Sequence, residues 1–365
     1  MPTTSRSNRR YKIAGLVAAA GVAGWLAVVA AGRRPDDMAG AREALDARAF
    51  RTAGAHLEQH LKRHPADADA LLLAARAARR NRVYHKATAH LAKYRQAGGS
   101  AETAALEDRL ARVQRGDLAE ADALLAYPDG HPDIFLVLEA VVEGSVAALA
   151  AQEAQGQLDP TGPAVARAKR AADRFLAAPL GQADQAQGHF WRGTIHNHAQ
   201  EHGPAVADLR RAVAEVPDHF EARQALALTI AQANPREALS HLERLIRARP
   251  DDFSLRYSEA TIRRSLGQSA EARRLLDDLL DDRPQDYQVL LERGLADLDA
   301  GLAGSAEAFL RRALAAAPRN PEITMAISRC LRVQGRVAEA DDLFAKAQDF
   351  EAERTRARNQ MRPKN

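Results

Sequence analysis

The chain has 365 residues, of which 46% are hydrophobic, 27% are charged and only 5% are aromatic. This length allows two or three domains or one long repeat array, and the composition excludes bulk disorder. A single cysteine, Cys330, excludes an internal disulfide framework and any multi-cysteine zinc or iron–sulfur site. With so few aromatic residues the core must consist mainly of Ala, Leu and Val, which favours closely packed helices.

The net charge of +4 is distributed unevenly along the chain. Residues 1–34 carry six basic residues and no acid, and residues 351–365 carry five basic residues and two acids. The intervening residues 35–350 hold 41 basic and 46 acidic side chains. A mildly acidic body with basic ends differs from the continuous basic face of nucleic-acid-binding proteins, so we expect no nucleic-acid partner.

The first predicted element is the uncharged stretch of 20 residues from Ile13 to Gly32. As a helix rising about 1.5 Å per residue it would span roughly 30 Å, the thickness of a bilayer's hydrocarbon core. Arg9, Arg10 and Lys12 precede the stretch, so the basic tail 1–12 is expected in the cytoplasm. We therefore predict a transmembrane helix or signal anchor at 13–32, with the rest of the chain outside the cytoplasm.

A cleaved signal peptide is the alternative interpretation of the same residues. Val29, Ala30 and Ala31 provide the small side chains of a cleavage site after an apolar stretch. In this case the protein would be exported after cleavage. Both interpretations place residues 35–365 outside the cytoplasm.

The second half of the chain has a period of 33–34 residues. Prolines recur at this interval, and glycines and alanines recur in register with them. The recurring positions are Pro217, Pro250, Pro284 and Pro318; Gly267, Gly301 and Gly335; and Ala272, Ala306 and Ala340. A fixed period of this length predicts an α-solenoid, in which stacked repeats bury a shared core.

On these residues the chain resembles the tetratricopeptide repeat (TPR) family. The repeat 287–320 carries the pattern most fully, with Gly294, Gly301, Ala306, Leu310, Ala313 and Pro318. The resemblance implies five consecutive repeats over 186–353, each a hairpin of two antiparallel helices. Small residues would allow close helix approach, Gly would allow the reversal, and the Asp after each proline (Asp218, Asp251) would cap the next helix.

The first half of the chain follows this pattern less closely. Pro65, Gly98 and Pro132 mark breaks at similar intervals, so degenerate TPR-like hairpins are predicted over 34–131. Residues 132–185 are predicted to form one enlarged helical hairpin, and residues 354–365 a basic tail. The predicted fold is all-α: an N-terminal transmembrane helix followed by an α-solenoid of about nine TPR-like hairpins.

The resemblance also implies a concave groove, lined by the first helix of each repeat, in which partner peptides or protein segments bind. Aromatic, amide, apolar and Arg side chains at these positions suit peptide recognition. The lysine of the chaperone-tail-binding clamp is missing throughout, which argues against that specificity. The residues expected to line the groove are Phe190, Asn197, His198, Gln224, Tyr257, Arg264, Leu291, Leu298, Arg329 and Arg332.

Motifs for catalysis are missing from the sequence. It contains no GxxxxGK[ST], GxGxxG, GxSxG or CxxC string. Histidines at 56, 60 and 64 and at 189, 196, 198 and 202 include pairs one helical turn apart, the spacing of some zinc ligands, but no HExxH motif accompanies them. We therefore predict no catalytic, cofactor-binding or metal-binding residues, no cofactor and no enzymatic activity.

The sequence thus predicts a membrane-tethered TPR scaffold or adaptor that binds a protein or peptide partner in its concave groove. By analogy with proteins of this layout, the role would be in assembling envelope complexes. One alternative is a structural homo-oligomer without a client peptide, which would self-associate through the anchor or the end of the array. Another alternative is a histidine-based metal-handling protein.

Overall fold

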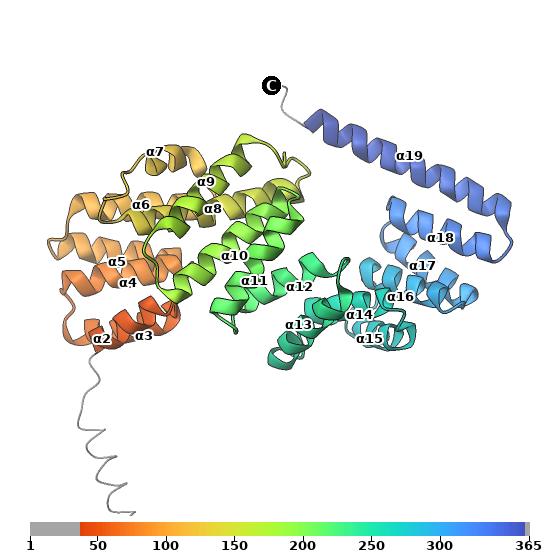
Figure 1. Ribbon diagram of the computed structural model, residues 1–365, viewed down its shortest axis with the longest axis horizontal. Coiled ribbons are helices and arrows are strands. Elements are labelled where there is room, and N and C mark those ends of the chain that lie inside the picture. The colour runs from red at the N-terminus through yellow and green to blue at the C-terminus, as the bar shows by residue number, and fades with distance from the viewer. Residues whose placement is uncertain (1–36, 362–365) are drawn as a thin grey trace, which may run out of the picture. The chain divides into compact units, whose positions relative to one another are not determined.

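The computed structural model describes residues 37–361 of the chain, with side chains through residue 356. This part contains eighteen α-helices, a short 3-10 helix and no β-strand (Figure 1). It divides into two compact units, residues 1–108 and 109–365, which we call the N-terminal and C-terminal units. The predicted transmembrane helix at 13–32 and the tail 1–12 lie outside the described residues.

The described part of the N-terminal unit consists of short amphipathic helices that pair in chain order, α2 with α3 and α4 with α5. Their bounds are α2 Asp37–Asp46, α3 Phe50–Arg63, α4 Ala68–Arg80 and α5 Tyr84–Gln96, followed by the start of α6 Ala101–Gln114. Ala and Leu fill the core, as in the fully buried Ala53, Leu57 and Ala70.

The C-terminal unit continues the same pairing through six further hairpins, from α8 with α9 to α18 with α19. After α6 come η1 Leu118–Glu120, α7 Ala121–Leu125, α8 Ile134–Ala154, α9 Pro163–Ala177, α10 Gln182–His198, α11 His202–Glu215, α12 Phe220–Ile230, α13 Pro235–Ala248, α14 Phe253–Ser265, α15 Ser269–Asp282, α16 Tyr287–Asp299, α17 Ala303–Ala316, α18 Pro321–Val333 and α19 Val337–Met361. Each hairpin contacts the next, so the unit is a TPR-like solenoid.

Two periodic residue types have clear roles in the hairpins. At the reversal between α16 and α17, Gly301 has a φ of 76°, a left-handed conformation that side chains disfavour. At the crossing of these helices, a Cβ on Gly294 would lie 2.6 Å from the Cγ of Leu310. Glycine at this point therefore lets the two helices approach closely.

The predicted capping residues are wrong by one position. The N-cap of α14 is Asp252 and not Asp251, and its carboxylate accepts hydrogen bonds from the backbone N–H groups of Ser254 and Leu255. His219, not Asp218, caps α12. The reason is geometric: only the residue directly before the first helical residue can reach the free N–H groups of the first turn.

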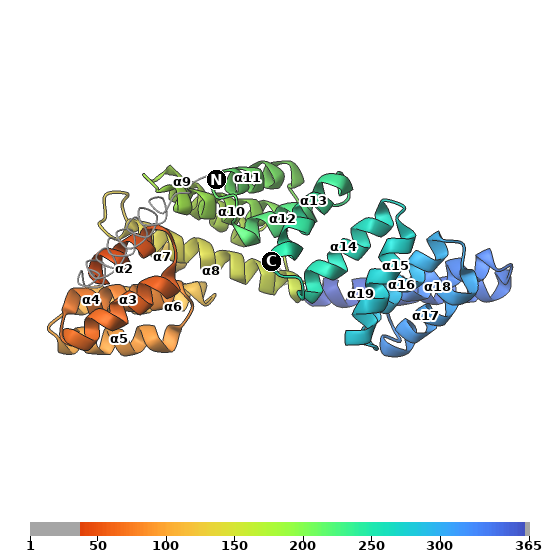
Figure 2. The ribbon, with the colours of Figure 1, turned by 90° about the horizontal axis from the view of Figure 1, so that it is seen from below.

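Helix α8 has the length and composition of a membrane span, with a mean hydropathy of 2.0 over its apolar window. However, 56% of this window is buried, and α8 packs against α7, α9 and α10 (Figure 2). Every residue of α8 from Val137 to Ser145 is buried, so all sides of the helix are covered there, as expected for a core helix. We therefore interpret α8 as a core helix of the C-terminal unit.

Candidate partner-binding surface

Several predicted groove residues are engaged within the chain. The Asn197 Nδ2 donates a hydrogen bond to the Oγ1 of Thr229, at 2.8 Å, and so links α10 to α12. The His198 Nδ1 lies 2.8 Å from a carboxylate oxygen of Glu153 at the end of α8. These side chains therefore stabilise contacts between helices and are less available to a partner.

Arg264 is the most strongly engaged of the predicted groove residues. Its Nε lies 2.8 Å from the Glu292 carboxylate and its Nη1 lies 2.9 Å from that of Asp299. Both carboxylates belong to α16, so the guanidinium on α14 joins two successive repeats. The Arg264 side chain is only 23% exposed. It therefore connects two repeats and is less available to a partner.

The remaining predicted residues differ in how much surface they offer. Leu291 is 5% exposed and packs in the core of the last repeats, because its side of α16 faces neighbouring helices. Phe190, Gln224, Tyr257 and Leu298 are half-buried. Burial, with the nearby Glu292 carboxylate, raises the pKa of Tyr257 above its usual range. Arg329 and Arg332, with side chains 63% and 55% exposed, offer the most surface.

Arg329 lines a cleft of about 530 Å³ at the C-terminal end of the array, which we call the C-terminal cleft. Three helices contribute to it: α16, α18 and the second half of α19. The lining residues are Leu295, Pro321, Glu322, Met325, Ala326, Arg329, Ala347, Gln348, Glu351 and Arg354.

The cleft exists because α19 is much longer than the other second helices of the array. It has 25 residues, whereas α13, α15 and α17 have 14 each, and it extends past the start of α18 (Figure 1). Arg319 forms an ion pair with Glu353, and its guanidinium lies 5.5 Å from the ring centroid of Phe350. These contacts hold the second half of α19 against the preceding loop, where it forms one wall of the cleft.

The cleft combines an apolar floor with a rim of both charges. Met325 is 39% exposed, although it is a large apolar side chain, and it lies beside Leu295 and Ala326. At the rim, the Arg329 Nη2 has a long contact of 3.4 Å with Asp299. Because an exposed ion pair of this kind contributes about 0–1 kcal/mol, Arg329 can exchange Asp299 for a partner's carboxylate at little cost.

The repeat pattern does not predict the α19 wall or the contribution of Leu295 to the cleft. The signal was present: after Gly335 the sequence has no glycine or proline until Pro363, which is typical of one long helix. The repeat pattern alone ends near residue 353, so it gives no indication that the last helix continues.

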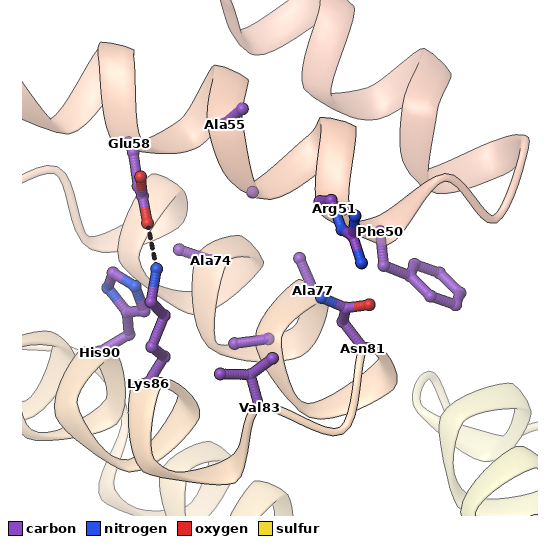
Figure 3. Close-up of a pocket in the computed structure, with 12 residues that line it drawn as sticks. Phe50, Arg51, Ala55, Glu58, Ala74, Ala77, Asn81, Val83, Lys86 and His90 are labelled. Carbon is purple, nitrogen blue, oxygen red and sulfur yellow. Dashed lines mark hydrogen bonds and ion pairs between the residues drawn. The ribbon is translucent and has the colours of Figure 1, made fainter. Parts of the chain in front are cut away.

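A second pocket, of about 230 Å³, lies in the N-terminal unit between α3, α4 and α5 (Figure 3). We call it the outer pocket. It has a floor of Gly and Ala and a rim that includes Arg51, Glu58, Lys86 and His90. The Lys86 Nζ donates a hydrogen bond of 2.9 Å to the Glu58 carboxylate across its mouth.

The histidine clusters pair with carboxylates. His60 lies 2.8 Å from Asp67, His189 lies 2.9 Å from Asp208, and His196 lies 2.6 Å from Glu201. Within residues 37–361, no three His, Cys, Asp or Glu side chains are grouped so that they could hold a metal ion.

Comparison with known families decides the identity of the repeats. One tetratricopeptide repeat model matches residues 228–287 and 257–321, and a second matches residues 297–359. Residues 228–359 of the chain are tetratricopeptide repeats. Such repeats support a protein–protein interaction scaffold.

Several solved structures are similar to about half of the chain. MamA from Desulfovibrio magneticus RS-1 is 14% identical, with a TM-score of 0.42, 47% of this chain covered and 98% of that chain. A thermophilic TPR protein of Thermus thermophilus is 24% identical, with a TM-score of 0.40 and coverage of 47% and 98%. A comparison with curated protein sequences finds no match.

Proposed function

We propose that this TPR protein is a membrane-tethered adaptor that holds a peptide segment of a partner protein in the C-terminal cleft. The segment would insert an apolar side chain over Met325 and place an acidic residue beside Arg329. The apolar stretch at 13–32 would tether the array to the membrane, outside the cytoplasm. A role in assembling envelope complexes rests on analogy with proteins of this layout.

The observation that carries this proposal is the exposure of Met325 inside a cleft. Elsewhere on the first helices, Asn197, His198 and Arg264 are engaged by neighbouring helices. Large apolar side chains in a concave site, next to exposed charge, are typical of anchor pockets in protein interfaces. The groove predicted from sequence would therefore be used chiefly at its C-terminal end.

The paired substitution Met325→Glu/Arg329→Glu is expected to reduce partner binding at least tenfold. It places a charge on the apolar floor and reverses the rim charge, and loss of an anchor residue at an interface commonly costs more than about 1.4 kcal/mol. A photo-crosslinking amino acid at Gln348, on the α19 wall, would measure this in the native host. The crosslinked partner should disappear in the double variant.

Helix α18 provides a matched control, Val333→Glu/Arg332→Glu, with the same change of charge. Both residues are exposed and lie outside the cleft, and Arg332 belongs to the groove predicted from sequence. The control should retain the crosslink. Equal loss in both variants, or in neither, would contradict binding in the cleft.

The end face of the array favours a second candidate function, self-association. Leu209, Leu242, Leu276 and Leu310 occupy one position of successive repeats, and each is fully buried because the following helix covers it. Phe344 occupies the same position in the last repeat and is 38% exposed. Terminal repeats of soluble arrays usually have polar outer faces, so this apolar end is suited to a second copy.

Phe344→Arg/Val337→Arg tests self-association. If the end faces pair, full-length protein in mild detergent should shift from dimer to monomer in analytical ultracentrifugation, with dimer affinity reduced at least tenfold. Leu302→Arg, at an exposed apolar residue between α16 and α17 in the preceding repeat, is the control. A wild-type protein that is monomeric at all concentrations would eliminate this candidate.

A further inference from the structure

The stretch from α3 to α5 is far more basic than the rest of the body. Residues 48–96 contain eleven Lys and Arg side chains but three acids. The basic residues are Arg48, Arg51, Lys62, Arg63, Arg76, Arg79, Arg80, Arg82, Lys86, Lys93 and Arg95, and the acids are Glu58, Asp67 and Asp69. Arg63, Arg76, Arg79 and Arg95 form ion pairs with acids outside this stretch, namely Asp37, Glu107 and Asp108. The basic excess that remains, which includes the lysines, attracts anions although the body as a whole is acidic.

Lys86 lines the outer pocket, and two further lysines lie on the helices that form it, α3 and α5. The whole chain has 45 arginines and only seven lysines, and three of these, Lys62, Lys86 and Lys93, are exposed residues of α3 and α5. Lys86 and Lys62 both lower the pKa of Glu58, the first through a hydrogen bond, which places them around one carboxylate. Lys93 lies near enough to His90 to add to the effect of burial, which lowers the pKa of that imidazole.

The outer pocket, with Lys86 on its rim, is open and small. Gly54 and Ala55 of α3 and Ala74 and Ala78 of α4 form its floor, and a Cβ added to Gly54 would meet no atom within 4 Å. His90 extends toward the same space beside Lys86 (Figure 3), and its Nδ1 is buried without a hydrogen-bond partner. The site thus combines an unpartnered imidazole nitrogen with the rim cations Arg51 and Lys86, of which Lys86 is paired with Glu58.

We propose that the outer pocket and its lysines bind the phosphate of an anionic phospholipid headgroup. Compact, strongly charged lysine ammonium groups suit a phosphate, and the pocket volume suits one headgroup. The position in the chain favours a lipid source: only residues 33–36 separate the predicted membrane segment from α2. The inference therefore rests on the proposed tether, which would hold the N-terminal unit beside the bilayer.

Binding of this kind should strengthen about fivefold for each basic residue near an anionic surface, and it should weaken with salt. It would also orient the N-terminal unit, with the outer sides of α3 and α5 toward the membrane. A tether alone predicts neither orientation nor dependence on lipid charge.

The experiment uses the full-length chain in vesicles of phosphatidylcholine alone or mixed with phosphatidylglycerol. An environment-sensitive fluorophore is attached at Ala89→Cys, an exposed position of α5 between Lys86 and Lys93; the native Cys330 is buried. Its emission should shift to the blue, and nitroxide-labelled lipid should quench it, only in the phosphatidylglycerol vesicles. High salt should reverse both effects.

Lys62→Glu/Lys86→Glu/Lys93→Glu should reduce the response to phosphatidylglycerol by about a hundredfold in apparent affinity. The matched control reverses three exposed arginines of the C-terminal unit, Arg210, Arg244 and Arg311, and should leave the response unchanged. A response equal in the lysine variant and in wild type would overturn the proposal.

Gly54→Leu fills the pocket without changing any charge. We expect it to abolish the saturable response while the protein remains folded by circular dichroism. An unchanged response in this variant would show diffuse attraction and overturn the headgroup site. Inorganic phosphate that competes as effectively as phosphatidylglycerol, or an acidic protein that binds while both vesicles fail, would also overturn it.

Failure of the tether would look different from failure of the headgroup site. An untethered chain would be washed from phosphatidylcholine vesicles by alkaline carbonate, yet at neutral pH it would still float with phosphatidylglycerol vesicles if the pocket binds headgroups. A tethered chain whose label gives the same signal in both vesicles would retain the tether and lose the headgroup site.

Discussion

Asp297→Ala is expected to lower the free energy of unfolding by about 3–5 kcal/mol. The Asp297 carboxylate is fully buried and faces two cations, the Nη1 of Arg293 at 2.5 Å and the Nε of Arg273 at 2.8 Å. The Oγ of Ser305 donates a hydrogen bond of 2.6 Å to its other oxygen. Removing the anion leaves the 6% exposed Arg293 with Asp277 as its remaining carboxylate and a gap in the interface between repeats.

Urea unfolding followed by circular dichroism measures the change. The control is Asp281→Ala, at an exposed aspartate of α15, which should stay within about 0.5 kcal/mol of wild type. Hydrogen exchange should quicken first in α15, α16 and α17, because the carboxylate joins these three helices. A loss as small as the control's would mean that the network contributes no more than surface ion pairs do.

Gly144→Ala is expected to destabilise the protein by about 3 kcal/mol, at the upper end of the usual range for overpacking. A Cβ at this position would lie 2.0 Å from the carbonyl oxygen of Val113 and 2.8 Å from its carbonyl carbon. These are backbone atoms of α6, so no side chain can rotate away. Helix α8 is also enclosed by α7, α9 and α10, which prevents it from moving back.

Gly304→Ala is the control for Gly144→Ala, because it makes the same substitution at a helical glycine that has free space around it. A Cβ there would meet no atom within 4 Å, so the substitution should leave stability unchanged or raise it by up to about 1 kcal/mol. Thermal unfolding of both variants beside wild type makes the comparison. A Gly144→Ala protein as stable as the Gly304→Ala protein would contradict the close approach of α8 to α6.

The regular repeats were predictable because their sequence pattern has direct physical causes. Gly301 is needed for a left-handed reversal, and its glycine recurs with the period of the fold at 267 and 335. Gly294 is needed for a close crossing, and its position recurs as a small residue, Ala260 and Ser328. Other reversals are less visible in the sequence. Arg82 and Gln200 have φ values of 60° at the corresponding turns, so the same backbone conformation occurs there without glycine.

The sequence predicted which helices carry the candidate binding residues, but not which of their side chains are free to contact a partner. Arg264 and Arg329 lie on first helices of the inner face and are chemically identical, yet one bridges two carboxylates and the other has a single long contact. That difference depends on the tertiary positions of Glu292 and Asp299, which a repeat pattern does not encode. Likewise, the total charge of residues 35–350 concealed the basic stretch from α3 to α5.

Helix α8 also matters before the protein is folded. A chain that crosses a membrane unfolded exposes this 21-residue apolar segment before α9 and α10 cover it, and a translocation channel can release such a segment sideways into lipid. Glu139 and Glu143 lie one turn apart within it. A charged side chain at mid-span costs about 2.5–3.5 kcal/mol, so in the proposed topology these two acids would favour complete passage over arrest at α8.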